Sequence, residues 1–446
     1  MSNGSITELV AKSNLDNDLL DIENKKSIFT FDTCKKNKYS KGDFKFYPEG
    51  KPNWGNTFRI NIDKKGDLLY GLYLIVKLPK LSINNLNTPI VQNENDPNSI
   101  YRIKYADFIG NILIETISLY INGQLIDEQT GEYMQIYTDL YLSDWNRKAM
   151  LGLDNTTPNL KIDSEYVYIP LKFWFCNEHN KPLPVIAMQY SDIYVDIKFR
   201  NFNDCVLVLE NDVNLNLFHS IYIHKEIAIE DVFLQANFYY LELEERKQLA
   251  LKNYEIVITQ TQYRSTNFKN SSTLLIDFNH VVKDMFFYIQ PSKNETNGEY
   301  FNFSTKLEYP PAELNGQINI NLYKLAPQKH LLNRARILFN GSERVEWRDA
   351  KYFFRMQNHE NYKNKLDAFV YLYCFNIDPT RYINNNGCNF SRIDVPQLQV
   401  EVTPDRFFLG NNTYYPINDT YNLYCYATNF NILIIKNGLV GLKYNN

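Results

Sequence analysis

The stretch from residue 173 to 199 constrains the fold more than any other part of the sequence. It begins with an aromatic run, passes through a polar turn and a Pro-Leu-Pro corner, and ends in a strict alternation. In that alternation Ile193, Val195, Ile197 and Phe199 share one side, and Tyr194, Asp196 and Lys198 share the other. A period of two is typical of a β-strand with one buried face. The sequence therefore predicts a half-buried strand over 193–199.

The same strand pattern recurs along the chain. Aromatic residues make up 15% of the sequence, with 34 Tyr and 28 Phe, which favours strands over helices. Two Asn-Gly pairs, at Asn122 and Asn340, predict hairpins because both turn residues need positive φ. We expect strands or hairpins over 27–31, 58–62, 68–78, 112–126, 206–217, 221–227, 232–240, 254–260, 271–276, 285–289, 318–322, 336–347, 369–375, 397–402 and 431–435.

Two segments have helical character and set the expected domain boundaries. Residues 133–142 place apolar side chains at three- and four-residue spacing, at Met134, Tyr137, Leu140 and Tyr141. Residues 242–251 contain no Gly, Pro or β-branched residue and offer a Glu242–Arg246 pair. We interpret the second segment as a linker helix over 242–253. It divides the chain into an N-terminal arm at 1–26, a first domain at 27–241 and a second at 254–446.

The two expected domains share four landmarks in the same order. Residues 68–79 correspond to 285–291, the Asn122 turn to the Asn340 turn, the aromatic run ending at Cys176 to the run ending at Cys374, and the strand around Val195 to the strand around Val400. This weak self-similarity favours two copies of one all-β unit. Eight to ten short strands with long polar loops in each half are typical of a sandwich or a jelly roll.

Charge and cysteine content exclude several classes of protein. The net charge of −4 does not suggest a general nucleic-acid binder. A basic cluster at Lys35, Lys36, Lys38 and Lys41 is either a solvated loop or a contact with acidic lipid or nucleic acid. Residues 1–25 are polar and predict no secretory signal, and the apolar stretch 68–76 is too short to span a bilayer. We therefore expect the six cysteines to be reduced, with disulfides as the alternative.

No pattern of residues predicts catalysis. The sequence contains no nucleophile elbow, phosphate-binding loop or zinc-binding helix motif. His219 and His224 would face opposite sides of one strand, and Glu244 with Glu245 would lie on a solvated helix face. Cys388 lacks a neighbouring His and is interpreted as a core residue. We therefore expect no catalytic residue, no cofactor and no metal site. Asn389 and the other sequons are not expected to carry glycans added in the endoplasmic reticulum.

Several short motifs follow one another along the chain. One of them is Gly387–Asp394, GCNFSRID. The others are Glu8–Ala11, Arg59-Ile60, Gly66–Leu69 with Leu78-Pro79, Gly110, Ile117–Glu132, Phe173–Phe175, the residues Leu183, Pro184, Ile186, Ala187, Gln189 and Tyr190, and further on Tyr240–Glu242, Glu244–Arg246, Arg336–Arg348 and Tyr352-Phe353. These motifs resemble those of one viral family, the major capsid proteins of nucleocytoplasmic large DNA viruses; GCNFSRID matches most sharply, and the order of the motifs is more specific than any one of them. The sequence departs from the family around Lys35 and Leu81.

The resemblance implies an all-β fold of two consecutive eight-stranded jelly rolls, a double jelly roll, with short helices in loops and linker. It implies a structural protein that forms homotrimers of pseudo-hexagonal outline and then an icosahedral shell. The implied partners are the chain itself, neighbouring capsomers, minor capsid proteins and an inner membrane, with no specific nucleic acid. The implied location is the virion, after assembly in the host cytoplasm. Two alternatives stay open: an assembly scaffold of the same fold, and a carbohydrate-binding jelly-roll protein.

Overall fold

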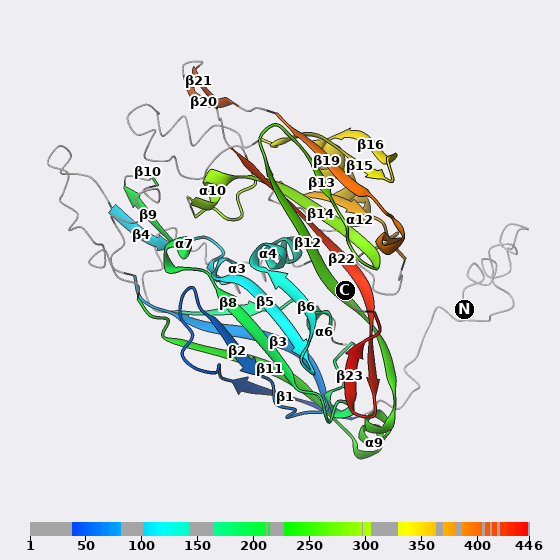
Figure 1. The fold of residues 1–446 in the computed structure, drawn as a ribbon. Coiled ribbons are helices and arrows are strands. Elements are labelled where there is room, and N and C mark those ends of the chain that lie inside the picture. Colours follow the sequence, from blue (N-terminus) through cyan, green and yellow to red (C-terminus); the bar gives the residue numbers. More distant parts are fainter. Residues whose placement is uncertain are drawn as a thin grey trace, which may run out of the picture. The chain divides into compact units, whose positions relative to one another are not determined.

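Two four-stranded sheets form the first half of the chain, in a computed structural model (Figure 1). One has the order β1 (Tyr39–Phe46), β11 (Asp231–Leu241), β3 (Leu68–Leu78), β7 (Glu165–Pro170). The other has the order β2 (Thr57–Asn61), β8 (Ile193–Phe199), β5 (Ile114–Ile121), β6 (Gln124–Thr130). The structure describes residues 38–81, 101–141, 165–177, 179, 181–210, 213–214, 227–296, 298–304, 329–362, 369–379, 386–403, 406–410, 413–416 and 420–444.

The second half repeats this arrangement strand for strand. Its first sheet has the order β12 (Tyr254–Phe268), β22 (Tyr421–Lys436), β14 (Val281–Pro291), β17 (Tyr371–Cys374), with β18 (Cys388–Asn389) and β23 (Leu439–Leu442) at its margins. Its second sheet has the order β13 (Ser271–Leu275), β19 (Pro396–Val402), β15 (Leu332–Phe339), β16 (Ser342–Asp349). We number only the strands that form the four-stranded paths given above, from one to eight along each half. In both halves these strands then pair in the orders 1-8-3-6 and 2-7-4-5. This identical order defines two jelly rolls, so the fold is a double jelly roll.

Short helices and small ribbons fill the connections. In the first half these are β4 (Tyr101–Tyr105), β9 (Val206–Glu210), β10 (Val213–Asn214), α3 (Ile109–Leu113), α4 (Gly131–Tyr141), α6 (Trp174–Asn177), α7 (Phe202–Cys205) and the 3₁₀ turn η2 (Val185–Ala187). In the second half they are α9 (Leu243–Leu251), α10 (Ser292–Thr296), the π-helix η5 (Tyr352–Met356), α12 (Gln357–Asn361), the 3₁₀ turn η6 (Phe390–Arg392), β20 (Arg406–Gly410) and β21 (Thr413–Pro416). Within these described residues, no helix is long and apolar enough to cross a membrane.

The strand and turn predictions agree well with the structure. Along β8 the burial alternates residue by residue, with Val195 fully buried between Ile60 of β2 and Leu119 of β5. Asn122 and Asn340 have positive φ, and each is followed by a glycine that also has positive φ. Both predicted hairpins are therefore confirmed, as β5–β6 and β15–β16. The helix expected over 133–142 is α4, and the linker helix is α9.

Three details of the sequence interpretation are wrong. The aromatic run ending at Cys176 is not equivalent to the run ending at Cys374: the first forms a turn and α6 after β7, and the second is β17 itself. The last core strand is not limited to 431–435, because β22 runs from Tyr421 to Lys436 and β23 follows it. Arg246 forms its ion pair with Asp67 and not with Glu242. The arm at 1–26, the predicted strands at 27–31, 221–226 and 318–322, and His219 and His224 lie outside the described residues.

The hydrophobic core extends from one jelly roll into the other. One cluster contains the inward side chains of both first-half sheets and also residues of the second half, among them Ile258, Phe286, Tyr426 and Leu433. A second cluster lies inside the second jelly roll, with Phe287, Ile337 and Leu398. Residues 39–446 form one compact unit by their contacts. The division of this unit into domains near 242–253 stays a prediction.

Candidate functional site

Aromatic, polar and charged side chains meet on the surface where the two jelly rolls contact each other, and we call this surface the junction. It consists of residues from β6 and α4 on one side and, on the other, of residues from β12, β14 and β22 and of Tyr362, which directly follows α12. In Figure 1, α4 lies where β6 of the first half approaches β12 of the second. Its principal residues are Asp127, Thr130, Tyr133, Tyr137, Tyr141, Phe286, Tyr288, Tyr362 and Tyr426.

Helix α4 carries three tyrosines, one per turn, and the first and last of them contact the second jelly roll. The four-residue spacing of Tyr133, Tyr137 and Tyr141 places their side chains on one face of the helix. The ring of Tyr133 stacks on Phe286 of β14 with centroids 5.7 Å apart, and Tyr141 meets Tyr362 edge to face at 5.8 Å. Aromatic pairs in these geometries are worth about 0.5–1.5 kcal/mol beyond the area they bury. The helix is thus held to the second half by aromatic contacts along its length.

The second jelly roll contributes aromatic residues from the outer face of its first sheet. Along β14, Met285 and Phe287 point into the second core, whereas Phe286 and Tyr288 point toward the first half. Phe286 stacks on Tyr426 of β22 with centroids 5.4 Å apart. Burial raises the pKa of the Tyr426 hydroxyl far above its usual range, so this group stays neutral. It lies 2.8 Å from the Thr130 hydroxyl, which joins two residues 296 positions apart.

A buried carboxyl group lies at the edge of the junction. Asp127 of β6 is almost fully buried, and its Oδ1 accepts a hydrogen bond from the backbone N–H of Thr261, at 2.7 Å. Its Oδ2 accepts a hydrogen bond from the side-chain amide of Gln129, at 2.8 Å. Burial raises the pKa of the Asp127 carboxyl to about 7, and these hydrogen bonds only partly oppose that effect. The junction therefore contains a group that titrates near neutral pH.

This carboxyl predicts how stability depends on pH. The folded protein binds the Asp127 proton more tightly than the unfolded chain, so the free energy of unfolding falls as the pH rises from about 4 to about 7, by at most about 1.4 kcal/mol per pH unit. Asp127→Asn keeps an oxygen for the Thr261 N–H and removes the titration. Urea unfolding at several pH values should therefore give a shallower decline for the variant. Parallel curves for variant and wild type would contradict the assignment.

An ion pair fixes the start of α4 and also reaches the second half. Arg200 donates a hydrogen bond from Nη2 to the carboxylate of Glu132, in the first turn of α4, and another from Nε to the carbonyl of Ile112 at 2.9 Å. Its guanidinium lies 4.4 Å from the ring centroid of Tyr300, which belongs to the second half. Desolvation lowers the pKa of Arg200, but the attraction of Glu132 and its hydrogen bond, together with Tyr300 and Cys205, outweighs it, and this pKa is raised above its usual range. The Arg200 guanidinium therefore stays charged.

The C-terminal hairpin forms a second contact between the halves. The Gly438 carbonyl, in the turn before β23, accepts a hydrogen bond from the backbone N–H of Tyr190 at 3.0 Å. The backbone N–H of Val440 donates to the Ser191 hydroxyl at 3.0 Å, and that of Leu442 donates to the Gln124 side chain at 3.1 Å. The end of the second jelly roll is thus attached to the β5–β6 turn and the loop before β8.

The linker helix α9 is attached to the first half by one buried carboxylate. Asp67 accepts a hydrogen bond from the backbone N–H of Leu241 and forms an ion pair with Arg246, each at 2.9 Å. Its neighbour Gly66 leaves no room for a side chain, because a Cβ there would lie 2.5 Å from the Cβ of Phe238. Two separate sequence motifs, Gly66–Leu69 and Glu244–Arg246, therefore meet in one contact.

The GCNFSRID motif also has a structural role. A Cβ on Gly387 would lie 2.4 Å from the carbonyl oxygen of Val282, so only glycine allows β18 to pair with β14. The backbone N–H of His280 donates to the Ser391 hydroxyl at 2.7 Å, and Phe390 is buried among Phe278, Phe339 and Phe375. The motif thus forms a short turn, η6, directly before strand β19.

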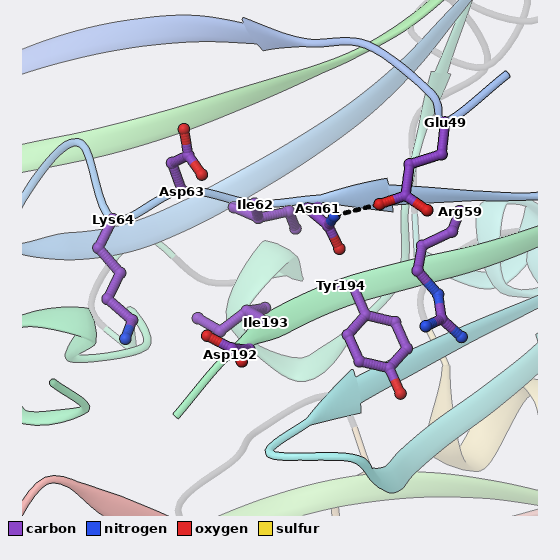
Figure 2. A pocket seen from close by; sticks show the side chains of 9 residues that line it. All are labelled: Glu49, Arg59, Asn61, Ile62, Asp63, Lys64, Asp192, Ile193 and Tyr194. Carbon is purple, nitrogen blue, oxygen red and sulfur yellow. Dashed lines mark hydrogen bonds between the residues drawn. The ribbon is translucent and has the colours of Figure 1, made fainter. Parts of the chain in front are cut away.

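An open hollow of about 500 Å³ lies on the first half, and Figure 2 shows its lining. Its charged groups are mostly paired with each other: Arg59 forms two hydrogen bonds with Asp196, at 2.7 and 2.8 Å, and the Asn61 amide donates to Glu49 at 2.6 Å. The ring of Tyr194, on the central strand β8, is covered by the Arg59 guanidinium on the β2 side and by Tyr120 on the β5 side. No free aromatic face is left there for a sugar ring.

The residues considered for chemistry are dispersed. Glu244 is exposed on α9, and Cys388 is half-buried beside β14. The five cysteines within the described ranges are free thiols. Among all the residues that the structure describes, no group of three His, Cys, Asp or Glu side chains is placed to hold a metal ion. The arrangement supports rigid association of two jelly rolls.

Comparison with known proteins places the chain in a family. Residues 27–242 match the family model described as major capsid protein N-terminus, and residues 245–441 match that of large eukaryotic DNA virus major capsid protein. The major capsid protein of Phaeocystis pouchetii virus is 23% identical over 89% of this chain and 91% of its own length. That of Paramecium bursaria Chlorella virus 1 is 25% identical over 89% of each chain.

Solved structures show the same fold. The crystal structure of PBCV-1 VP54, fitted into a reconstruction of the virophage Sputnik, superposes with a TM-score of 0.75 at 20% identity, over 94% of this chain and all of that one. The Faustovirus major capsid protein superposes with a TM-score of 0.67 at 11% identity, over 95% and 94%. The chain is thus a structural protein of the virus-capsid class. It belongs to the major capsid protein family of large eukaryotic DNA viruses.

Proposed function

We propose that this chain forms homotrimers of pseudo-hexagonal outline, which pack with neighbouring capsomers into an icosahedral shell. The observation that carries the proposal is the exact repetition of one strand order in two jelly rolls that a buried junction joins into one compact unit. Three such chains offer six nearly equivalent blocks around one axis, and six equal blocks fill a hexagonal lattice. Closed rotational symmetry is also the usual form of homo-oligomers.

The trimer should be visible in solution. Size-exclusion chromatography with light scattering should give three times the 52.6 kDa mass of the chain. The trimer should dissociate on dilution together with a loss of thermal stability, because association and folding are linked by mass action. A strictly monomeric protein at micromolar concentration would contradict the proposal.

The proposed division of labour within the chain follows the linker helix. We infer an arm at 1–26, jelly rolls at 27–241 and 254–446, and a linker at 242–253. The exposed surface of α9, with Glu244 and Lys247 facing solvent, supports a boundary there. Limited proteolysis should cut first within 242–253, and a first cut inside either jelly roll would argue against the division.

Further partners are part of the same proposal. In the virion, minor capsid proteins and an inner membrane would contact the shell, after assembly in the host cytoplasm, and no specific nucleic acid or catalytic activity is involved. An assembly scaffold of the same fold is the competing function. Mass spectrometry of purified virions separates the two, because a major capsid protein is the dominant component and a scaffold is absent. The covered Tyr194 ring gives the carbohydrate-binding alternative no support.

A further inference from the structure

Strand β23 is an edge strand whose free side faces the first jelly roll. Its other side pairs with the end of β22, where Val440 lies opposite Ile435 and Leu442 lies opposite Leu433. In an antiparallel pair the backbone groups of alternate residues point toward the partner strand, and those of the residues between them point away. The N–H groups of Val440 and Leu442 point away from β22, because they donate to side chains of the first half. An open strand edge is therefore covered by side chains and not by another strand.

Four residues of the first half hold this edge, and we call them the strand slot. They come from the β5–β6 turn, the start of β6 and the loop before β8, and they are Asn122, Gln124, Tyr190 and Ser191. The Leu442 N–H donates to Gln124 Oε1 at 3.1 Å. The Gly438 carbonyl accepts a hydrogen bond from the Tyr190 N–H at 3.0 Å, and the Val440 carbonyl accepts one from the Asn122 amide at 3.5 Å. The slot thus contacts backbone groups of three alternate residues, 438, 440 and 442.

Ser191 lies at the centre of the strand slot. The residue has no exposed surface. Its hydroxyl accepts a hydrogen bond from the Val440 N–H at 3.0 Å and donates one to the Gly438 carbonyl at 3.3 Å. A serine hydroxyl offers one donor and two acceptor positions, so one side chain serves two groups of the same strand edge. A buried polar group without a partner is destabilising, so the slot and the strand depend on each other.

The strand slot also selects side chains at two positions of the strand. Gly438 has a φ of +81°, and a Cβ there would lie 2.6 Å from Cδ2 of the Tyr190 ring, so both the backbone and the space favour glycine. The Val440 side chain is buried and belongs to the hydrophobic cluster of the first half, together with Leu433 and Ile435 of β22. The slot therefore distinguishes strands by a glycine and by an apolar residue two positions later.

Strand β23 can leave the slot without unfolding either jelly roll. It lies outside the eight strands whose order the two halves share. It has four residues, of which Val440 alone is buried, and the Leu439 side chain is 51% exposed. Segments with few buried apolar contacts open locally at a much lower cost in free energy than the whole fold. The slot is therefore alternately occupied and empty.

We propose that the strand slot is a peptide-binding site and that β23 occupies it as a reversible clasp between the two halves. A bound strand lies between β22 on one side and the slot on the other, so its backbone is held along both edges, as in other strand-addition sites. The peptides that fit are extended, with glycine at the position of Gly438 and an apolar residue at that of Val440. The proposal does not rest on the trimer, because every residue in it belongs to one chain.

Hydrogen exchange of the full-length protein tests the clasp. Ser191→Ala removes the hydroxyl that serves two backbone groups of the strand edge, so the amides of residues 439–443 should exchange at least about tenfold faster than in wild type. Ser118→Ala is the matched control, because Ser118 is also buried in the first half but its hydroxyl donates to Glu128, outside the slot. In the control, the exchange of residues 439–443 should be unchanged. Equal exchange in Ser191→Ala and wild type would overturn the proposal.

An added peptide tests the slot as a binding site. In full-length Val440→Asp, β23 should leave the slot, because the new carboxylate would be buried without a partner. A dye-labelled peptide with the sequence of residues 437–444 should bind this variant, which fluorescence anisotropy detects. It should bind wild type at least about tenfold more weakly, because β23 competes with it. The same peptide carrying Val440→Asp should not bind. A folded Val440→Asp protein that does not bind the wild-type peptide would overturn the proposal; if this variant does not fold, the exchange comparison decides alone.

Discussion

Val195→Asp should abolish folding of the first jelly roll at ordinary temperatures. Val195 has no exposed surface and lies on β8, the strand between β2 and β5. A carboxylate at this position would enter the core between Ile60 and Leu119 without a partner. An unpaired buried charge, together with the lost apolar contacts, costs roughly 4–5 kcal/mol, a large part of the stability of a typical domain.

The control lies three residues further along the same strand. Lys198 faces outward, with 43% of its side chain exposed, and forms an ion pair with Glu115. Lys198→Asp loses that surface pair and should cost about 1 kcal/mol or less. Urea unfolding followed by circular dichroism compares the two variants. Equal stability of Val195→Asp and wild type would mean that the register of β8 is wrong.

The strands of the fold were largely predictable because their signals are local. The alternation along β8 and the Asn-Gly turns before β6 and β16 depend on neighbouring residues only, and each appears in the structure as expected. A further Asn-Gly pair, Asn437-Gly438, carries the same turn signal. Both residues have positive φ, and they turn the chain into β23. That pair was the available signal for the C-terminal hairpin and its contact with the first half.

The junction was only half predictable. The spacing of apolar residues along 133–142 indicated a helix, but a helix face does not reveal which surface it covers. Of the partners of α4, Phe286 lies in the predicted strand 285–289, whereas Tyr426 lies outside the predicted last strand 431–435, and neither segment indicates a contact with α4. Asp67 and Arg246 are far apart in the sequence, and the nearby Glu242 offered a simpler pair. Contacts of this kind depend on tertiary packing, which a single sequence does not encode locally.

One more signal for the junction was present in the sequence, at Gly131. A glycine at the start of a helix weakens it relative to alanine, so its presence needs a reason. The structure supplies one: a Cβ on Gly131 would lie 2.1 Å from the carbonyl oxygen of Asn111 and 2.5 Å from that of Ile114. Both obstacles are backbone atoms of the α3–β5 segment, which cannot turn aside as a side chain can. The close approach sets the position from which α4 reaches the second jelly roll.

Gly131→Ala should therefore destabilise the protein by about 3 kcal/mol or more, although alanine favours helices elsewhere. To avoid the clash α4 must shift, and the contacts of Tyr133 and Thr130 with the second half weaken with it. The urea midpoint should fall, and cleavage of the linker helix by a protease should become faster. Gly71→Ala is the matched control, since a Cβ on Gly71 meets its nearest neighbour at 3.4 Å, an ordinary contact. If both variants lost stability equally, the close approach at Gly131 would not be what positions α4 against the second jelly roll.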